Sequence, residues 1–156
     1  MRISESYVCV PLIEAKDYGS AGIDSDSVNM GRLHHLGAVL TFGAITGNSV
    51  LKVYSGATAA AKTTALAFKY RLSAADYKVA LADTYGAATS VASTGLTLTA
   101  ATFDHRAIVV EVESDQMTDG HEWLTFEVSS VATILLLGAI GIGYPRLAGN
   151  VGPTVL

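Results

Sequence analysis

The sequence has few cysteines, few charges and no cluster of basic residues, and each shortage excludes a class of protein. It holds a single cysteine, Cys9, so a disulfide within the chain is impossible. Its ten Lys and Arg residues are scattered singly along the chain. Nucleic acids and anionic membrane surfaces are bound by clustered cations. We therefore expect neither a direct nucleic-acid partner nor a membrane partner.

Charged residues make up only 15% of the chain, against about 25% in an average soluble protein. The formal net charge is −4, and hydrophobic residues account for 50% of the sequence. A surface with so few charges is weakly protected against association. We therefore expect part of the surface to be covered by a partner or by further copies of the chain.

The most apolar stretch, residues 131–142, is too short for a transmembrane helix, which needs about 20 residues. It also contains Gly138 and Gly141, and it predicts a strand that is buried on both faces. The first residues include no apolar segment typical of a signal peptide, so we expect synthesis in a cytoplasm. Cys9 lies between valines and is expected to be a small buried hydrophobe.

Alternation of apolar and polar residues dominates the chain. In one segment Leu124, Phe126 and Val128 share a face, and Trp123 falls on the other face. The predicted strands are 5–13, 33–45, 49–55, 63–72, 77–82, 96–101, 105–113, 121–129 and 131–142. About eight or nine short strands at this spacing predict an all-β domain, a β-sandwich or jelly roll, with a barrel as the alternative.

Turn residues and polar segments separate the predicted strands. Residues 46–49 (Thr-Gly-Asn-Ser) predict a hairpin, and residues 73–81 predict a turn or one short helix with Ser73 as its N-cap. Residues 14–31 are polar and rich in Gly and Ser, which predicts a loop over the sandwich. Residues 147–156 are expected to form an extended tail, and the N-terminal segment is expected to be extended as well. The whole chain, 1–156, is predicted to be one domain.

A search for reactive groups finds no catalytic constellation. His34 and His35 are adjacent on a predicted strand, so their side chains point to opposite faces and cannot bind one ion together. Residues 24–29 faintly resemble a calcium loop, but they lack the Gly and Glu of an EF-hand. Their Asp and Ser side chains are better explained by hydrogen bonds to their own backbone. We expect no catalytic residue, no cofactor and no metal.

Several segments resemble, in their order along the chain, the capsid decoration or cement proteins of tailed bacteriophages. The segments are Ala15-Lys16-Asp17, 24–30 (DSDSVNM), 33–36 (LHHL), 62–71 (KTTALAFKYR), 108–117 (IVVEVESDQM), 143–147 (GYPRL) and Pro153-Thr154. The resemblance implies a β-sandwich or jelly roll that binds the major capsid protein on the outside of the virion. It also implies self-association, as a dimer or trimer, and a role in stabilising the capsid.

Three parts of the chain are candidate interfaces in such an assembly. Aromatic residues and arginines dominate the binding energy of interfaces, and extended arms add strands to other chains. The candidates are Trp123, the group Tyr144, Pro145 and Arg146 after the last predicted strand, and Met1, Arg2 and Ile3 in the N-terminal arm. The alternatives are another phage structural subunit (tail tube or head–tail connector), a carbohydrate-binding β-sandwich and an enzyme.

Overall fold

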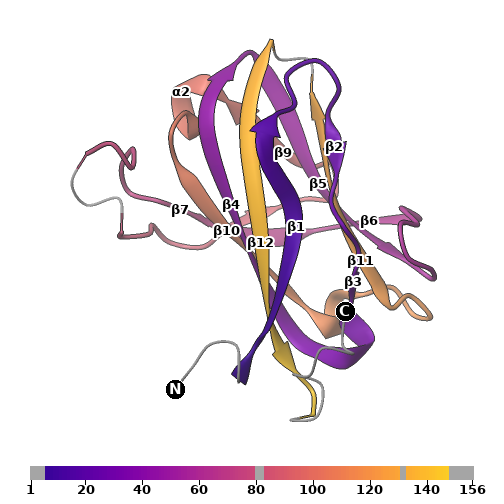
Figure 1. Cartoon of the computed structure of the whole chain (residues 1–156). Coiled ribbons are helices and arrows are strands. Elements are labelled where there is room, and N and C mark those ends of the chain that lie inside the picture. Colours follow the sequence, from indigo (N-terminus) through magenta and orange to yellow (C-terminus); the bar gives the residue numbers. More distant parts are fainter. Residues whose placement is uncertain (1–5, 80–82, 131–132, 148–156) are drawn as a thin grey trace.

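The computed structural model describes residues 6–79, 83–130 and 133–147, and it confirms an all-β protein (Figure 1). The predicted arm residues Met1, Arg2 and Ile3 lie outside the described residues, as does the tail beyond Leu147. The elements are β1 (Val8–Asp17), β2 (Ile23–Asp24), β3 (Val28–Asn29), the 3-10 turn η1 (Met30–Arg32), β4 (Leu33–Thr46), β5 (Asn48–Gly56), β6 (Thr64–Leu66), β7 (Phe68–Leu72), β8 (Thr89–Val91), β9 (Leu96–Thr99), the one-turn helix α2 (Ala100–Phe103), β10 (Ala107–Glu113), η2 (Ser114–Gln116), β11 (Trp123–Ser130) and β12 (Ile134–Pro145).

The strands form two open antiparallel sheets. Sheet A has the order β1-β12-β4-β10-β7-β8, and sheet B has the order β2-β11-β5-β6, with β3 beside β11 and β9 beside β5. Figure 1 shows β1, β12 and β4 side by side across the front of the molecule, with β11 and β5 behind them. One core cluster draws on residues of both sheets.

The chain pairs with itself in a nested way. β1 pairs with β12, β2 and β3 pair with β11, β4 pairs with β10, and β5 pairs with β9. Successive pairs lie alternately in sheet A and sheet B. The short strands β6, β7 and β8 are an insertion between β5 and β9, the two strands of the innermost pair. Strands β7 and β8 extend sheet A beyond β10.

The alternating rows of the sequence point into the space between the sheets, as predicted. Leu124 and Phe126 in β11, and Ile108 and Val110 in β10, are at most 1% exposed. Burying an aliphatic or aromatic side chain of this kind contributes about 1.5–3 kcal/mol. Because the rows of both sheets meet in one cluster, the core holds the two sheets together.

Two predictions, a hairpin and a continuous strand, are wrong because the chain changes sheet within them. Residues 46–49 form a tight bend but no hairpin: Gly47, at φ 94°, leads from β4 in sheet A to β5 in sheet B. A positive φ of this size favours glycine. The predicted strand 63–72 divides at Ala67, with Leu66 ending β6 in sheet B and Phe68 opening β7 in sheet A. Alternation continues through Ala67, so the sequence pattern does not reveal the crossing.

The predictions for two polar segments also need correction. The predicted strand 77–82 is a turn at 77–79, and 80–82 lie outside the described residues. Of the two alternatives for 73–81, a turn or one short helix, the described part of the segment has the turn; Ser73 caps no helix there and forms an isolated bridge with Tyr85. The predicted loop 14–31 is only partly a loop, because 14–17 complete β1, and β2, β3 and η1 follow.

The last strand differs from its prediction in a way that matters for function. β12 begins three residues later than expected and runs to Pro145. Its inward residues, such as Leu135 and Leu137, are buried, but Ile140 is 56% exposed and Leu136 is 39% exposed. The strand is therefore not buried on both faces. Cys9, which was expected to be buried, is exposed on the neighbouring strand β1.

Candidate functional site

The outer side of sheet A carries a row of apolar side chains across four strands. Pro11 of β1 pairs with Ile140 of β12, Ile140 pairs with Val39 of β4, and Val39 pairs with Val109 of β10. Directly paired residues project from the same side of a sheet. Their inward neighbours are buried in the core, so this row faces outward.

The adjacent row is also apolar over β1, β12 and β4. Cys9 pairs with Ile142, and Ile142 pairs with Gly37; charge begins only at Glu111 in β10. β12 contains no Asp, Glu, Lys, Arg or His along its whole length. We call the outward residues Cys9, Pro11, Val39, Val109, Ile140 and Ile142 the apolar face.

A hollow lies beside Ile140, which is an exposed residue of the apolar face. Its volume is about 310 Å³, and its lining includes Ala15, Thr41 and Gly138 together with Pro11, Val39 and Ile140 of the apolar face. A side chain at Gly138 would crowd this spot, because a Cβ at this position would lie 3.0 Å from the Ala15 Cβ atom. The apolar face is therefore a projecting isoleucine next to a depression without charged groups.

The predicted interface residues at the end of β12 behave differently from one another. Tyr144 is 53% exposed, and its ring lies 6.1 Å from the rings of both Tyr7 and His34. Pro145 is buried. Arg146 is exposed, but its Nε donates to the Leu33 carbonyl at 2.9 Å, which ties it to its own chain. Tyr144 is thus the member of this group that presents most apolar surface to a partner.

Trp123, the other aromatic candidate, lies far from the apolar face. It belongs to β11 in sheet B, in register with Asn29 and Gly56, and it is half-buried on the outer side of that sheet. Its prediction to lie opposite Leu124 and Phe126 is confirmed by the burial of those two residues. The structure does not bring Trp123 together with Tyr144, which belongs to sheet A.

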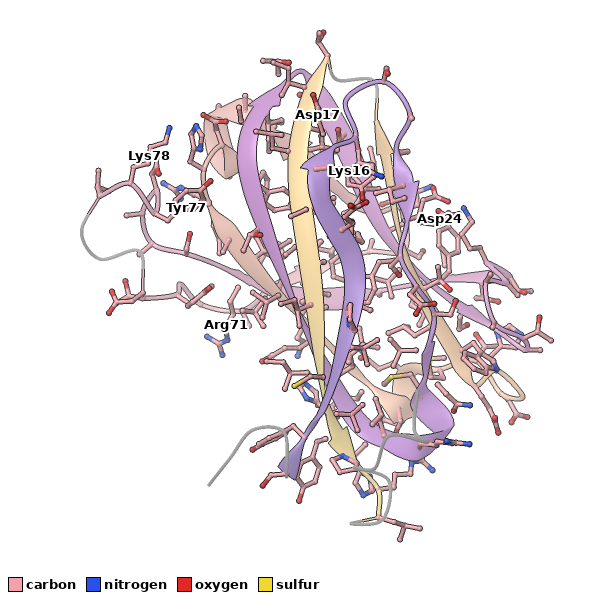
Figure 2. The ribbon with its side chains drawn as sticks, viewed as in Figure 1. Lys16, Asp17, Asp24, Arg71, Tyr77 and Lys78 are labelled. Atoms are coloured by element: carbon pink, nitrogen blue, oxygen red, sulfur yellow. The ribbon has the colours of Figure 1, made fainter. Side chains whose placement is uncertain are left out.

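The outer side of sheet B is charged and partly covered. Lys62 lies 2.9 Å from Asp24 and also bonds the Glu127 carboxylate. The hydrogen bonds that Lys62 donates to Glu127 and then to Asp24 raise the pKa of Lys62 above its usual 10.5. Nearby, Thr125 is only 1% exposed, because Ser27 bonds it at 2.8 Å beneath the loop around residues 57–63. Figure 2 shows Asp24 on one side of the front strands and Arg71 and Tyr77 on the other.

In the segment that resembles a calcium loop, three polar side chains accept hydrogen bonds from backbone N–H groups. Asp26 accepts from the Ser27 N–H, Asn29 accepts from the Gly31 N–H, and Ser25 accepts from the Phe126 N–H. The interpretation as a self-bonded loop is therefore confirmed in part, because Asp24 binds Lys62 and Ser27 bonds the Thr125 hydroxyl instead. Within residues 6–79, 83–130 and 133–147, no three His, Cys, Asp or Glu side chains are grouped so as to hold a metal ion.

The structure brings together one serine–histidine pair that the sequence did not predict. The Ser55 Oγ lies 2.9 Å from the His121 Nδ1 and also donates to the Thr118 Oγ1 at 3.1 Å. No local signal marks the pair, because its members are 66 residues apart. Ser55 has no exposed surface, so its hydroxyl is out of reach of a substrate. The pair therefore has a structural role, in which the polar groups at the edge of the core satisfy one another by hydrogen bonds.

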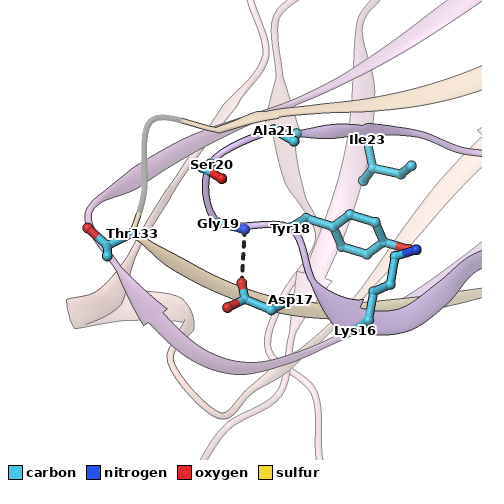
Figure 3. Close-up of a pocket in the computed structure, with 9 residues that line it drawn as sticks. Lys16, Asp17, Tyr18, Gly19, Ser20, Ala21, Ile23 and Thr133 are labelled. Atoms are coloured by element: carbon cyan, nitrogen blue, oxygen red, sulfur yellow. Dashed lines mark hydrogen bonds between the residues drawn. The ribbon is translucent and has the colours of Figure 1, made fainter.

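A second hollow, of about 410 Å³, lies at the turn between β1 and β2 (Figure 3). Its acidic group is already satisfied, since the Asp17 carboxylate accepts from the backbone N–H groups of Gly19 and Leu135. The Lys16 ammonium lies 5.3 Å from the centre of the Tyr18 ring. Among the described residues, every buried polar side-chain atom has a hydrogen-bond partner. These groups stabilise the turn and leave no unpaired buried donor or acceptor for a ligand.

Comparison with family models, with curated proteins and with solved structures finds no match for this chain. None of the helices in the described part of the chain is long and apolar enough to cross a bilayer. The feature that sequence reasoning missed is the apolar face, and its signal was the run of apolar residues in β12 at both inward and outward positions.

Proposed function

We propose that this chain is a non-enzymatic structural protein of a tailed-phage virion, which binds the outside of the capsid as a decoration protein. The observation that carries the proposal is the apolar face, a contiguous uncharged surface on sheet A. Soluble monomers rarely expose large contiguous apolar patches, and such patches mark sites of protein–protein contact. A protein that works by packing against other subunits needs a surface of this kind.

The fold, in its finer description, is proposed to be a jelly roll. A jelly roll has eight strands in two sheets and two Greek keys. The nested pairs of β1 with β12, β2 and β3 with β11, β4 with β10, and β5 with β9 support this topology. The insertion of β6, β7 and β8 between β5 and β9 departs from it. A jelly roll is also what the resemblance to decoration proteins implies.

The edges of both sheets favour association through a face. The edge strand β1 contains Pro11 and two register shifts, and both features hinder the pairing of a further strand. The other edge strands, β8, β2, β3, β6 and β9, are two to four residues long. Short and bulged edges are protected against edge-to-edge pairing. The exposed Ile140 and Leu136 lie on the face of sheet A instead.

The proposed mechanism is stabilisation by binding. A protein that binds only the assembled lattice stabilises that lattice by mass action, and the effect is multiplied over many sites. The chain would be made in the host cytoplasm and would end on the capsid exterior, in contact with the major capsid protein. The order of the segments quoted above supports this location, and the low charge of the chain supports extensive protein contact.

The experiment that tests this proposal is quantitative mass spectrometry of purified virions of the phage that encodes the chain. We expect a copy number in the hundreds, in a fixed ratio to the major capsid protein. Six or twelve copies would instead indicate a tail or connector subunit, and absence from the virion would reject any structural role there. Binding on a glycan array that disappears with EDTA would favour a carbohydrate-binding module.

A further inference from the structure

The apolar face contains a projection and a depression side by side on one strand. Ile140 is 56% exposed, and the hollow of about 310 Å³ beside it is lined by Gly138, Ala15 and Thr41 as well as by Ile140 itself. Ile140 and Gly138 point to the same side of β12 and are two residues apart, about 7 Å along the strand. No charged side chain lines the hollow.

We propose that the apolar face binds a second copy of this chain, with the Ile140 side chain of each copy seated in the Gly138 hollow of the other. A two-fold axis that lies in the interface, across the strands at the level of Ala139, exchanges the positions of residues 138 and 140. It therefore places each projection over the opposite depression. Such an isologous contact requires one surface that is complementary to itself, and this spacing provides it.

The size of the face fits a dimer. Strands lie about 4.8 Å apart and rise about 3.3 Å per residue. Between the levels of Leu136 and Tyr144, β12 and β4 run the whole way, β1 ends at Val8 and β10 begins at Ala107, so the four strands cover roughly 450 Å² on each copy. The total of roughly 900 Å² is close to the lower limit for a specific interface.

The residues around the centre permit the close approach that two stacked sheets require. Gly37 and Gly138 point outward from β4 and β12, and Thr41 is the outward residue beside Gly138. Two sheets packed face to face lie about 10 Å apart. Small residues next to Ile140 let the backbones of two copies reach this separation, while the isoleucines fill the remaining space.

A second copy explains the surface better than a partner of another sequence does. The projection and the hollow both belong to this chain, and they match in kind and in spacing. This inference deepens the proposed function and rests on its premise that the apolar face packs against a protein subunit: it names a second copy of the chain as that subunit, bound in solution with no capsid present. A chain that is monomeric yet abundant on virions would overturn the dimer and leave the proposed function standing. A chain that dimerises in solution but is absent from virions would overturn the proposed function and leave the dimer standing.

The test is sedimentation equilibrium of the full chain and three variants at about physiological ionic strength. We expect a dimer for the wild type, and a dissociation constant raised about 100-fold by Ile140→Asp, because a carboxylate would enter an apolar hollow. Val79→Asp is the matched control: Val79 is 58% exposed but lies on the loop after β7, so the variant should dimerise normally. Circular dichroism will show that each variant is folded.

A third variant distinguishes a specific fit of Ile140 in the hollow from nonspecific hydrophobic association. Ala15→Leu fills the hollow but adds apolar surface, so a specific fit predicts weaker dimerisation, by about ten-fold or more. Tighter association of Ala15→Leu would overturn the proposal. So would a wild-type monomer at about 100 µM, a trimer, or equal weakening by Val79→Asp.

Discussion

The outer sides of the two sheets arise from the same alternation of residues, but they differ in whether ion pairs and loops of the chain cover them. On sheet B, Lys62 joins Asp24 and Glu127 across the strands, and a loop covers Thr125. On sheet A, the centre has neither ion pairs nor a covering loop among the described residues, and Ile140 stands exposed. The outer side of sheet B is paired and covered by groups of its own chain, whereas the outer side of sheet A is suited to being covered by a partner. The predictions below test this difference.

The largest effect is expected when the same acidic group is placed on each outer side. Thr125→Asp puts a charge under the loop of sheet B, where the native residue is 1% exposed, and it should lower the free energy of unfolding by about 3 kcal/mol. Ile140→Asp on sheet A should lower it by less than about 1 kcal/mol in dilute, monomeric protein. Urea denaturation of both variants measures the difference. Equal losses would mean that both sides are covered alike.

A smaller loss is expected from the loop that closes the sheet B side. The Ser25 Oγ accepts from the Phe126 N–H and donates to the Asp26 carbonyl, and Ser25 is 8% exposed. Ser25→Ala leaves a buried N–H unpaired and should cost about 2 kcal/mol of unfolding free energy. Ser20→Ala, at an exposed position, is the control and should cost less than about 0.5 kcal/mol. Thermal unfolding of the two variants checks this, and a Ser25→Ala protein as stable as the control would contradict it.

The ion pairs of sheet B should give a still smaller, pH-dependent contribution. Because the folded-state pKa of Lys62 is raised, its stabilising effect is fully present below the ordinary pKa of 10.5 and is lost as the pH rises through the folded pKa. Lys62→Met should therefore cost about 1 kcal/mol or less from pH 7 to pH 9, since solvent screens the pair. The difference from wild type should vanish at more alkaline pH.

Urea denaturation across this pH range measures the Lys62 contribution. Lys78→Met, at an exposed position on the loop after β7, is the matched control and should show no such dependence. A Lys62→Met deficit that grows above pH 10.5 would have the wrong sign for this account.

The smallest effect concerns reactivity and leaves stability unchanged. Cys9 is exposed on the apolar face, so a maleimide should label it in dilute native protein without denaturant. Labelling should slow several-fold at concentrations where the proposed dimer forms, because the Cys9 partner Ile142 lies in the contact. Labelling that requires unfolding would restore the expectation of a buried thiol, and labelling independent of concentration would argue against a contact at β1.

The sequence predicted the class of fold and the inward rows, because alternation is local. Rows such as Leu36 to Phe42 and Leu124 to Val128 point inward as expected, since each pattern depends only on neighbouring residues. It did not predict that the chain passes from one sheet to the other at Gly47 and at Ala67, because pairing partners are set by contacts between distant segments. It predicted the bend at Gly47 itself from its turn residues.

The candidate site was predicted less well than the fold. Alternation shows which residues share a side but not whether that side meets water, loop or partner, so β12 was expected to be buried on both sides. Trp123 and Tyr144 were chosen as aromatic anchors, yet the structure places them on different sheets. The apolar face depends on the register of Pro11, Ile140 and Val39, and no local pattern contains that register.

Hydroxyl-radical footprinting of dilute and concentrated protein tests the central claim most directly, since it reports on both outer sides at once. The account predicts that Ile140 and Pro11 on sheet A become protected as concentration rises, while Trp123 and Tyr54 on sheet B keep the same reactivity. Protection of Trp123 with Ile140 still reactive would contradict it, as would reactivity that is independent of concentration on both sheets.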